Sequence, residues 1–416
     1  MTIITHIDMN SFFASCEQQA NPALRGKVIG VCEHLGGIII APSIEAKRIG
    51  IKTAMPVWEA RKIYPRIQLM KVNARLYFDI SSRVHKVLSD YTDDIEEYSV
   101  DEFFLDLTES CNIRVKDGRR WTKLDPYVEA MRIILEIKQR IKKEVGDYLT
   151  ASAGIAPNKL LAKISGEFKK PDGLTVIRPE DIPNLYNILA LTDIPGISNA
   201  MERRLNRLGI RTLADLRDYP RSHLLQVFGI WGEHLHAFGQ LRSMPFEKKY
   251  GEQKPKSIGH VYTLPAEFRQ GKKFLEMFFK LCRMVAERMS NQGVRGNGLA
   301  LHIHGNGDEC YSFSSRYAQV EPNPQFIYRA SINLLAQKTP QVLEESFIAS
   351  RIGITVFDVF NDADQQYLFP KDRKNQSIMR AMEAIKSKHG DYKCAYMFDS
   401  LSKGIFRESV GFRRLS

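Results

Sequence analysis

The sequence predicts a multidomain α+β protein, and three observations support this prediction. The chain has 416 residues, 44% of them apolar, which is enough to bury more than one hydrophobic core. Strand and helix patterns are mixed up to about residue 170 and again beyond residue 257, whereas short helices with glycine-containing turns fill the segment between them. The stretch at 247–257 is polar and basic, as expected for an interdomain linker.

The elements of the first mixed region follow from hydrophobic periodicity. An apolar strand at 2–8 ends in Asp8, and helical spacing begins directly after it. Only Asp101 and Glu102 separate two expected strands, at 94–100 and 103–108. The remaining elements expected here are two β-rich runs within 27–42, a strand at 149–155, and helices at about 43–51, 55–65, 73–92, 125–146 and from 156 onward.

The rest of the chain divides into a helical segment and a second mixed region. Short helices are expected within 191–216 and 224–239. Beyond the linker we expect strands at 257–265, 298–305, 310–318 and 350–359, and helices at 272–290 and 323–337. This alternation predicts a second α+β domain.

Net charge and cysteine spacing narrow the class of partner and the cellular compartment. The formal net charge of +12 favours a polyanionic partner such as nucleic acid, although a basic chain can also be simply soluble. The six cysteines lie far apart without a CxxC pair, which argues against a zinc site or a disulfide framework and favours a reducing cytoplasm. No signal peptide is evident, and no apolar run reaches the roughly 18 residues needed to span a bilayer.

Three acids carry the chemical prediction. Asp8 taken alone could be an acid that stabilises the first turn of a helix. Asp101 and Glu102 make a poor two-residue hairpin turn, because such turns favour Asn-Gly or Asp-Gly. Adjacent carboxylates at a strand junction, joined by Asp8 from another strand, would be costly unless divalent cations neutralise them, and oxygen ligands suit magnesium. Two such ions catalyse phosphoryl displacement, so the acids predict nucleotidyl transfer.

Three segments, HIDMNSFFASCE (6–17), YSVDEFFLDLT (98–108) and GIAPNKLLAKISGEFKKPDGL (154–174), resemble the signature segments of the Y-family translesion DNA polymerases. The resemblance extends, with gaps, over about residues 1–360. It implies a right-hand fold, a low-fidelity template-directed polymerase without proofreading, and primer-template DNA and dNTP as partners of a monomer. The implied parts are a palm at 1–20 and 76–170, fingers at 21–75, a helical thumb at 171–240, a linker at 241–256, a little finger at 257–360 and a tail at 361–416.

The same resemblance implies roles for residues at the catalytic centre. Asp8, Asp101, Glu102 and the main-chain carbonyl of Met9 match ligands of two Mg²⁺ ions, whereas Asp106 is left as structural. Phe13 matches the steric gate that would clash with a ribose 2′-OH, although its spacing alone would also suit a core residue.

Two lysines are expected to bind the nucleotide. Lys159 follows Asn158 at a helix start, where a lone lysine is usually solvated but an anion can also bind. The resemblance implies the second role, because Lys159 matches the family's lysine that binds the incoming triphosphate. In the fingers, Ile44 and Lys47 stand where the family commonly has Tyr and Arg, and a branch of the family has a similar Glu-Ala-Lys segment. Lys47 supplies a point charge but no bidentate fork, and Ile44 cannot donate a hydrogen bond, so nucleotide affinity or lesion preference is expected to differ.

DNA contacts are expected in the thumb and around the linker. Residues 193–210 resemble a helix-hairpin-helix, whose turn at Gly196 offers amides to a phosphate, although Ser198 replaces the usual glycine and a distorted hairpin is expected. Arg203 and Arg204 add charge, unless they simply form a solvated helix face. A basic zone of Lys248, Lys249, Lys254, Lys256, Arg269, Lys272 and Lys273 fits a duplex backbone.

The segment DADQQYLFPKD (362–372) places Gln365, Leu368 and Phe369 in polar surroundings, so it is either an edge strand or a short docking peptide. It resembles the peptides by which bacterial polymerases bind the sliding clamp, which implies that partner.

Two other functions remain open from the residues alone. A palm-type nucleotidyl cyclase also uses two metals and carboxylates, although the basic second domain argues against it. A non-catalytic DNA-binding scaffold would follow if the departures at Ile44 and Lys47 had removed nucleotide binding.

Overall fold

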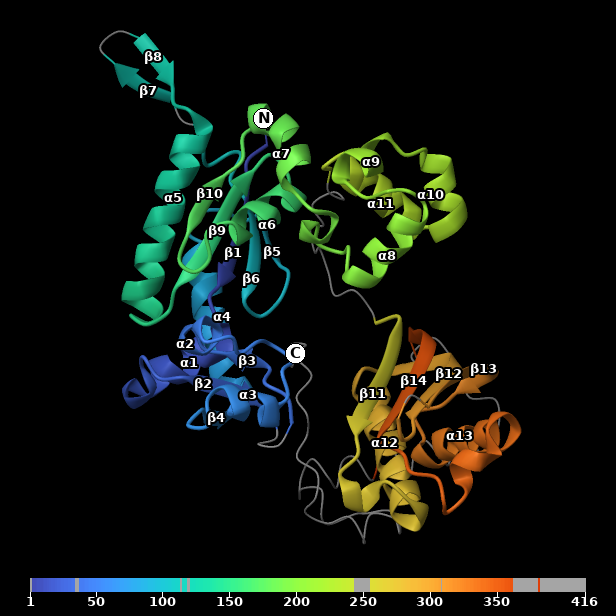
Figure 1. The fold of residues 1–416 in the computed structure, drawn as a ribbon. Helices are drawn as coiled ribbons and strands as arrows, with labels where there is room; N and C mark the ends of the chain where they lie inside the picture. Colours follow the sequence, from blue (N-terminus) through green and yellow to red (C-terminus); the bar gives the residue numbers. More distant parts are fainter. Residues whose placement is uncertain are drawn as a thin grey trace. The chain divides into compact units, whose positions relative to one another are not determined.

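The computed structural model describes residues 2–33, 37–112, 114–117, 120–242, 255–307, 309–361 and 381. These residues form two compact units, residues 2–242 and residues 255–361, and each unit has hydrophobic cores of its own (Figure 1). Mixed strands and helices in both units, with a helical segment at the end of the first, confirm the α+β prediction.

A five-stranded sheet in the order β10-β9-β1-β6-β5 organises the first unit. Its strands are β1 Ile4–Met9, β5 Ile95–Glu97, β6 Glu102–Asp106, β9 Ala151–Ala156 and β10 Leu174–Val176. Strand β1 lies in the middle and pairs antiparallel with β6 and with β9. The register sets Asp8 opposite Glu102, so two of the predicted acids come together from strands almost 100 residues apart in the sequence.

Side-chain alternation gives the sheet two different faces. Ile7 and Phe103 share a core with residues of helices α4 and α5, whereas Ile4 and Phe104 share one with residues of helix α6. Asp8 alternates with Ile7 and therefore lies on the α6 face. The helices of this part are α1 Phe12–Ala20, α4 Ala74–Leu88, α5 Pro126–Arg140 with a π-helical turn Ile141–Val145, and α6 Lys159–Glu167.

The connection between β5 and β6 differs from the prediction. Residues 98–101 connect the strands, and Glu102 already belongs to β6, so the expected two-residue turn of Asp101 and Glu102 is wrong. The backbone N–H groups of Tyr98 and Ser99 both donate to the Glu102 carbonyl, at 3.0 and 3.2 Å. These two bonds close a longer turn, and a turn of this kind does not require an Asn-Gly pair.

The described residues between 21 and 73 form a small subdomain, in which Cys32, Ile39 and Val57 belong to one core cluster while Ile29 and Val31 join the core of the large sheet. Its three-stranded sheet has the order β3-β2-β4. The elements are β2 Ile29–Cys32, β3 Ala41–Pro42, α2 Ile44–Arg48, α3 Val57–Ile63 and β4 Gln68–Lys71. A two-stranded hairpin, β7 Arg114–Asp117 and β8 Arg120–Lys123, precedes α5 and was not expected from the sequence.

The helical segment ends the first unit and shares a core with α6, through residues such as Leu161, Leu185 and Leu213. Its helices are α7 Ile182–Ile188, α8 Asn199–Arg207, α9 Leu213–Asp218, α10 Arg221–Phe228 and α11 Trp231–Gly239.

The second unit is a four-stranded antiparallel sheet, in the order β11-β14-β12-β13, packed on two helices. Its elements are β11 Ser257–Thr263, α12 Gly271–Asn291, β12 Val294–His304, β13 Cys310–Val320, α13 Pro324–Lys338 and β14 Arg351–Asn361. Within the described ranges, no helix of either unit is long and apolar enough to cross a bilayer.

One core position of the second unit is a histidine. His260 on β11 is 5% exposed, and no group of the described residues bonds to its Nε2. Burial, together with the nearby Arg288 guanidinium, lowers the pKa of His260 from 6.5 to about 4. The folded unit therefore holds this imidazole neutral, while the unfolded chain binds a proton more readily.

We expect the second unit to lose stability as the pH falls from 6.5 toward 4, by roughly 3 kcal/mol at most, because unfolding frees His260 to protonate. The variant His260→Leu should show a smaller loss, whereas His302→Leu, at an exposed position of the same sheet, should follow the wild type. Differential scanning calorimetry of the full chain between pH 7.5 and pH 5 measures this. Parallel pH profiles for wild type and His260→Leu would contradict it.

Candidate active site

Asp8 does not cap the helix that follows it. Helix α1 begins at Phe12, its N-cap is Ser11 in the left-handed region with φ 47°, and no side-chain cap bond or first-turn acid is present. The Asp8 side chain is 14% exposed and instead pairs with Lys170, its Oδ1 lying 3.1 Å from Nζ. The structural reading of Asp8 as a cap is therefore wrong.

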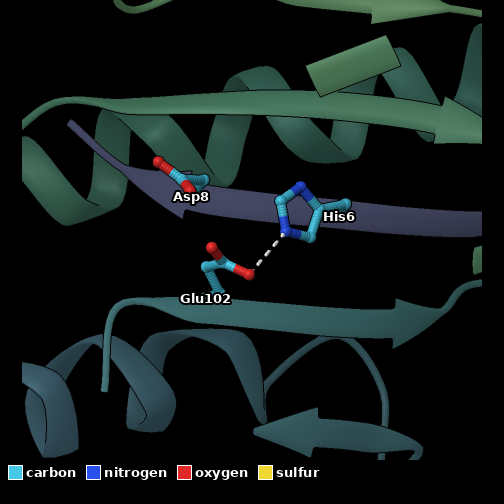
Figure 2. A group of neighbouring side chains, drawn as sticks. All are labelled: His6, Asp8 and Glu102. Atoms are coloured by element: carbon cyan, nitrogen blue, oxygen red, sulfur yellow. Dashed lines mark ion pairs between the residues drawn. The ribbon is translucent and has the colours of Figure 1, made fainter. Parts of the chain in front are cut away.

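Asp8, Glu102 and His6 form one group on the α6 face of the sheet (Figure 2). One potential ligand atom from each lies within 4.8 Å of those of the others. Asp8 and Glu102 are cross-strand neighbours, and His6, two residues before Asp8, contacts Glu102 with Nε2 3.5 Å from Oε2. The two carboxylates are hard oxygen donors of the kind that Mg²⁺ prefers.

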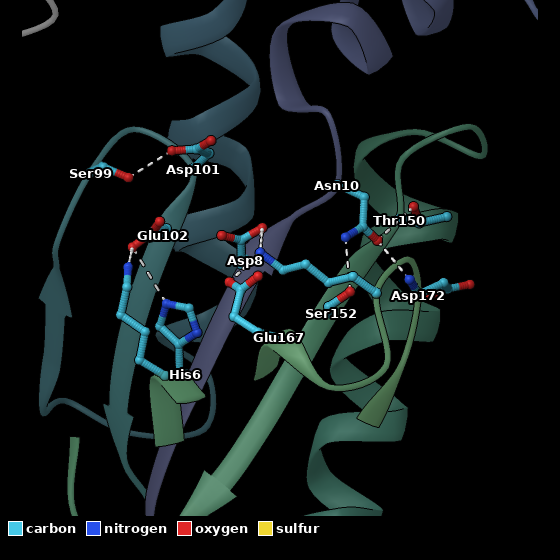
Figure 3. A network of polar contacts seen from close by, with 12 residues as sticks. His6, Asp8, Asn10, Ser99, Asp101, Glu102, Thr150, Ser152, Glu167 and Asp172 are labelled. Carbon is cyan, nitrogen blue, oxygen red and sulfur yellow. Dashed lines mark hydrogen bonds and ion pairs between the residues drawn. The ribbon is translucent and has the colours of Figure 1, made fainter. Parts of the chain in front are cut away.

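Asp101 lies at the end of the β5–β6 connection, next to this group but outside it (Figure 3). Its Oδ1 accepts a hydrogen bond of 2.6 Å from the Ser99 hydroxyl. Its backbone carbonyl accepts a hydrogen bond of 3.0 Å from the N–H of Met9. The loop bearing Asp101 is thus tied to the end of β1, beside Asp8.

Lysines of helix α6 cover the acidic face of the sheet. Lys163 forms an ion pair with Glu102, and Lys159, one turn earlier, lies 2.7 Å from Glu96 on β5. The Lys159 ammonium also lies over the Phe104 ring, 5.1 Å from its centroid. Residues four apart share a helix face, so both ammonium groups point to the sheet.

Glycines allow this helix to lie so close to the strands. A Cβ atom on Gly154 of β9 would lie 2.1 Å from the Ala162 carbonyl oxygen, and one on Gly166 would lie 3.1 Å from His6 Nδ1. Gly154 pairs with His6 in the sheet, so the close approach occurs beside the acids. The glycines of the GIAPNKLLAKISGE segment therefore position the lysines.

The charges around the site shift its pKa values in opposite directions. Burial raises the pKa of Asp8 to about 7, and the nearby Lys170 offsets only part of that rise. Burial also raises the pKa of Asp101. Burial alone would raise the pKa of Glu102, but its contacts with His6 and Lys163 outweigh this effect and lower the pKa to about 2. Burial lowers the pKa of His6, which favours the neutral imidazole.

Phe13 is partly buried at the edge of the core, not inside it. Its ring stacks on Tyr77, with centroids 4.5 Å apart and planes at 11°. The Tyr77 hydroxyl donates a hydrogen bond of 2.8 Å to Glu17 on the helix that carries Phe13. The gate candidate is thus a partly accessible ring held against a rigid aromatic partner.

Lys47 reaches toward the acids from the small subdomain. Lys47 is an exposed residue of α2, yet the charges of four groups near the acids influence its pKa: Lys170, Asp8, Glu167 and Asp101. Partial desolvation and the Lys170 ammonium lower the pKa of Lys47. Ile44 begins the same helix and is partly buried, with Ser43 as the N-cap.

The hairpin of the helical segment is regular at the position where distortion was expected. Gly196 has φ 103°, which suits glycine, but Ser198 is extended at φ −80° and caps α8 with its hydroxyl. A glycine is not required at Ser198, so the expected distortion is wrong. Arg203 is exposed on α8, and Arg204 stacks on Phe228 at 4.5 Å.

Several predicted residues lie elsewhere. Lys256 is exposed beside β11 of the second unit, and its carbonyl accepts from Val359 N–H. Lys254 and the clamp candidates Gln365, Leu368 and Phe369 lie outside the described residues, as do Lys248 and Lys249.

Sequence reasoning missed His6, Lys163 and Lys170 as members of the site. His6 could have been found from alternation, because it is two residues from Asp8 on a strand. Lys163 follows Lys159 by one helical turn, which was a readable signal. No local signal places Lys170, since it reaches Asp8 only through the path of the chain after α6.

Three parts of the chain match known protein families. Residues 7–167 match the impB/mucB/samB family, residues 192–240 match the thumb domain of DNA polymerase iota, and residues 255–368 match the C-terminal domain of the impB/mucB/samB family. The chain is 30% identical to DNA polymerase IV of Pelotomaculum thermopropionicum over 411 residues, covering 97% of each chain. It is 30% identical to DNA polymerase IV 1 of Bacillus subtilis over 402 residues, covering 93% of this chain and 91% of the relative.

The fold is also similar to a solved Y-family DNA polymerase chimera, with a TM-score of 0.70 and 27% identity. The similarity covers 86% of this chain and 99% of the chimera. Relatives that match nearly the whole chain, together with this likeness of fold, leave one family: the chain belongs to the Y-family translesion DNA polymerases.

Proposed function

We propose that this template-directed translesion DNA polymerase holds two Mg²⁺ ions through Asp8, Asp101, Glu102 and the Met9 carbonyl. The observation that supports the proposal is the cross-strand pair of Asp8 and Glu102 on one face of the sheet, with Asp101 on the loop just before Glu102. Like charges on directly opposed residues are unfavourable unless a cation neutralises them. Oxygen donors from carboxylates and a carbonyl fit Mg²⁺.

The residues of the chain divide the work of nucleotidyl transfer. Two divalent ions held by these acids would activate the primer 3′-hydroxyl and stabilise the leaving oxygens. Asp8 and Glu102 orient this chemistry on a rigid central strand pair. Lys47 and Lys159 offer positive charge to the triphosphate, and the partly accessible Phe13 ring excludes a 2′-hydroxyl by steric contact.

The DNA partner is proposed to contact the chain through phosphates. The Gly196 turn and the start of α8 present backbone amides, and the exposed Arg203 adds charge nearby. Lys254 and Lys256 are proposed as phosphate contacts of the same kind.

From the family and the sequence we also propose that the protein is a cytoplasmic monomer. We propose further that it binds a sliding clamp through Gln365, Leu368 and Phe369. A nucleotidyl cyclase or a non-catalytic scaffold is not favoured, because the relatives that cover nearly the whole chain are DNA polymerases.

Replacing Asp101 by Ala should lower primer extension roughly 100-fold or more, because a metal ligand is lost at the reacting centre, while DNA binding is kept. Asp106→Ala is the matched control on β6. The Asp106 carboxylate accepts a hydrogen bond of 2.9 Å from the Thr108 N–H and is not among the proposed metal ligands. Single-nucleotide insertion and DNA affinity are measured side by side. Extension by Asp101→Ala at the level of Asp106→Ala would rule out the ligand role.

Phe13→Ala should admit ribonucleotides, with the preference for dNTP over rNTP falling at least roughly tenfold, because the ring that meets the sugar is removed. Phe13→Tyr keeps the ring on Tyr77 and should retain the wild-type preference. The ratio of kcat/KM for dNTP and rNTP is the measurement. An unchanged ratio in Phe13→Ala would return Phe13 to a packing role.

Arg203→Gln should reduce the slope of log affinity for primer-template against log salt by roughly 0.7 to 0.9, as expected when one phosphate contact is lost. Arg217→Gln is the control, because Arg217 is already paired with Asp218 at 2.7 Å. Fluorescence anisotropy over a salt series measures both. Equal slopes for Arg203→Gln and wild type would exclude the contact.

A further inference from the structure

Lys170 stands beside Asp8 where a cation is expected to bind. Its Nζ lies 3.1 Å from Asp8 Oδ1 and 2.6 Å from Glu167 Oε1. The two carboxylates differ in their surroundings, since the Asp8 side chain is 14% exposed and that of Glu167 is 53% exposed. Lys170 is therefore shared between a buried acid at the site and a solvated acid at its rim.

The turn that carries Lys170 is fixed to β1 and to the end of α5 by several bonds. Asn10, at the end of β1, accepts the backbone N–H of Asp172 at 2.8 Å (Figure 3). Lys138 on α5 donates to the Asp172 carbonyl at 2.6 Å, and Lys142 lies 2.9 Å from the Asp172 carboxylate. With its backbone tied in this way, Lys170 can change partner only by moving its side chain.

Asn10 is itself held in place. Its Nδ2 donates to Ser152 Oγ at 2.8 Å, and its Oδ1 accepts from Thr150 Oγ1 at 3.1 Å (Figure 3). The strand that bears Asp8 and the turn that bears Lys170 are therefore held in register with each other by the same buried amide.

We infer that Lys170 is the resident counter-ion of Asp8, which yields this carboxylate to an incoming divalent cation and remains on Glu167. This rests on the proposed metal site at Asp8. A metal ion must displace a positive charge already in contact with its ligand, so Lys170 weakens metal binding. Glu167 retains the displaced ammonium, so Glu167 strengthens metal binding, but only while Lys170 is present.

The test is a double-mutant cycle on Mn²⁺ binding, followed by electron paramagnetic resonance of the free ion, with the full chain at pH 8 and without DNA or nucleotide. Lys170→Met should bind Mn²⁺ roughly tenfold more tightly, since an ion pair with a partly buried acid no longer competes. Glu167→Gln should weaken binding severalfold. In the Lys170→Met background, Glu167→Gln should have little further effect.

Lys169→Met is the matched control, because it removes the same charge from an adjacent, exposed position. It should stay within about twofold of the wild type, as long-range effects between solvated charges are weak. Circular dichroism establishes that each variant is folded.

The variants distinguish a wrong metal site from a wrong counter-ion role for Lys170. If Asp8→Asn leaves Mn²⁺ binding unchanged, the proposed metal site itself is wrong. If Asp8→Asn weakens binding but Lys170→Met behaves like Lys169→Met, the counter-ion role is overturned. A Glu167→Gln effect of equal size with and without Lys170 would also overturn it, because it would reflect only the general field of the site.

Discussion

The pairing of β1 with β6 is the constraint on which the rest of the site depends. Its register places Asp8 directly opposite Glu102, and like charges in such a cross-strand pair repel each other. The strands can hold this arrangement because both are flanked by buried apolar residues on the opposite face, such as Ile7 and Phe103. The core thus fixes the geometry, and the charge it imposes must be balanced from elsewhere.

That balance comes from one continuous stretch of chain. Helix α6 and the turn after it supply Lys159, Lys163 and Lys170, each in contact with a carboxylate of the sheet. The close approach of the helix depends on Gly154, where any side chain would meet the helix backbone. This one segment therefore supplies the positive charges that stabilise the acids in the folded protein.

The sequence was enough to predict the fold class and most strands and helices, because hydrophobic periodicity is a local signal. It also singled out Asp8 and Glu102 at strand ends, and the structure brings these two side chains together. The four-residue connection before Glu102 was missed because its hydrogen bonds, from Tyr98 and Ser99, leave no turn signature. The regular hairpin at Ser198 was missed because an N-cap role satisfies the position without glycine. Lys170 could not be placed, since its contact with Asp8 depends on how a turn crosses the end of β1.

The small subdomain has a core cluster of its own around Ile39 and Val57, while its Ile29 and Val31 join the core of the large sheet. Polar contacts also join it to the rest, such as Glu45, which accepts from Gln18 at 3.3 Å and from Tyr148 at 3.1 Å. Ile44 and Lys47 lie on its surface and do not belong to that core. Substitutions at these two positions can therefore leave the buried residues of both cores intact, so this part of the surface can change in sequence without a change of architecture.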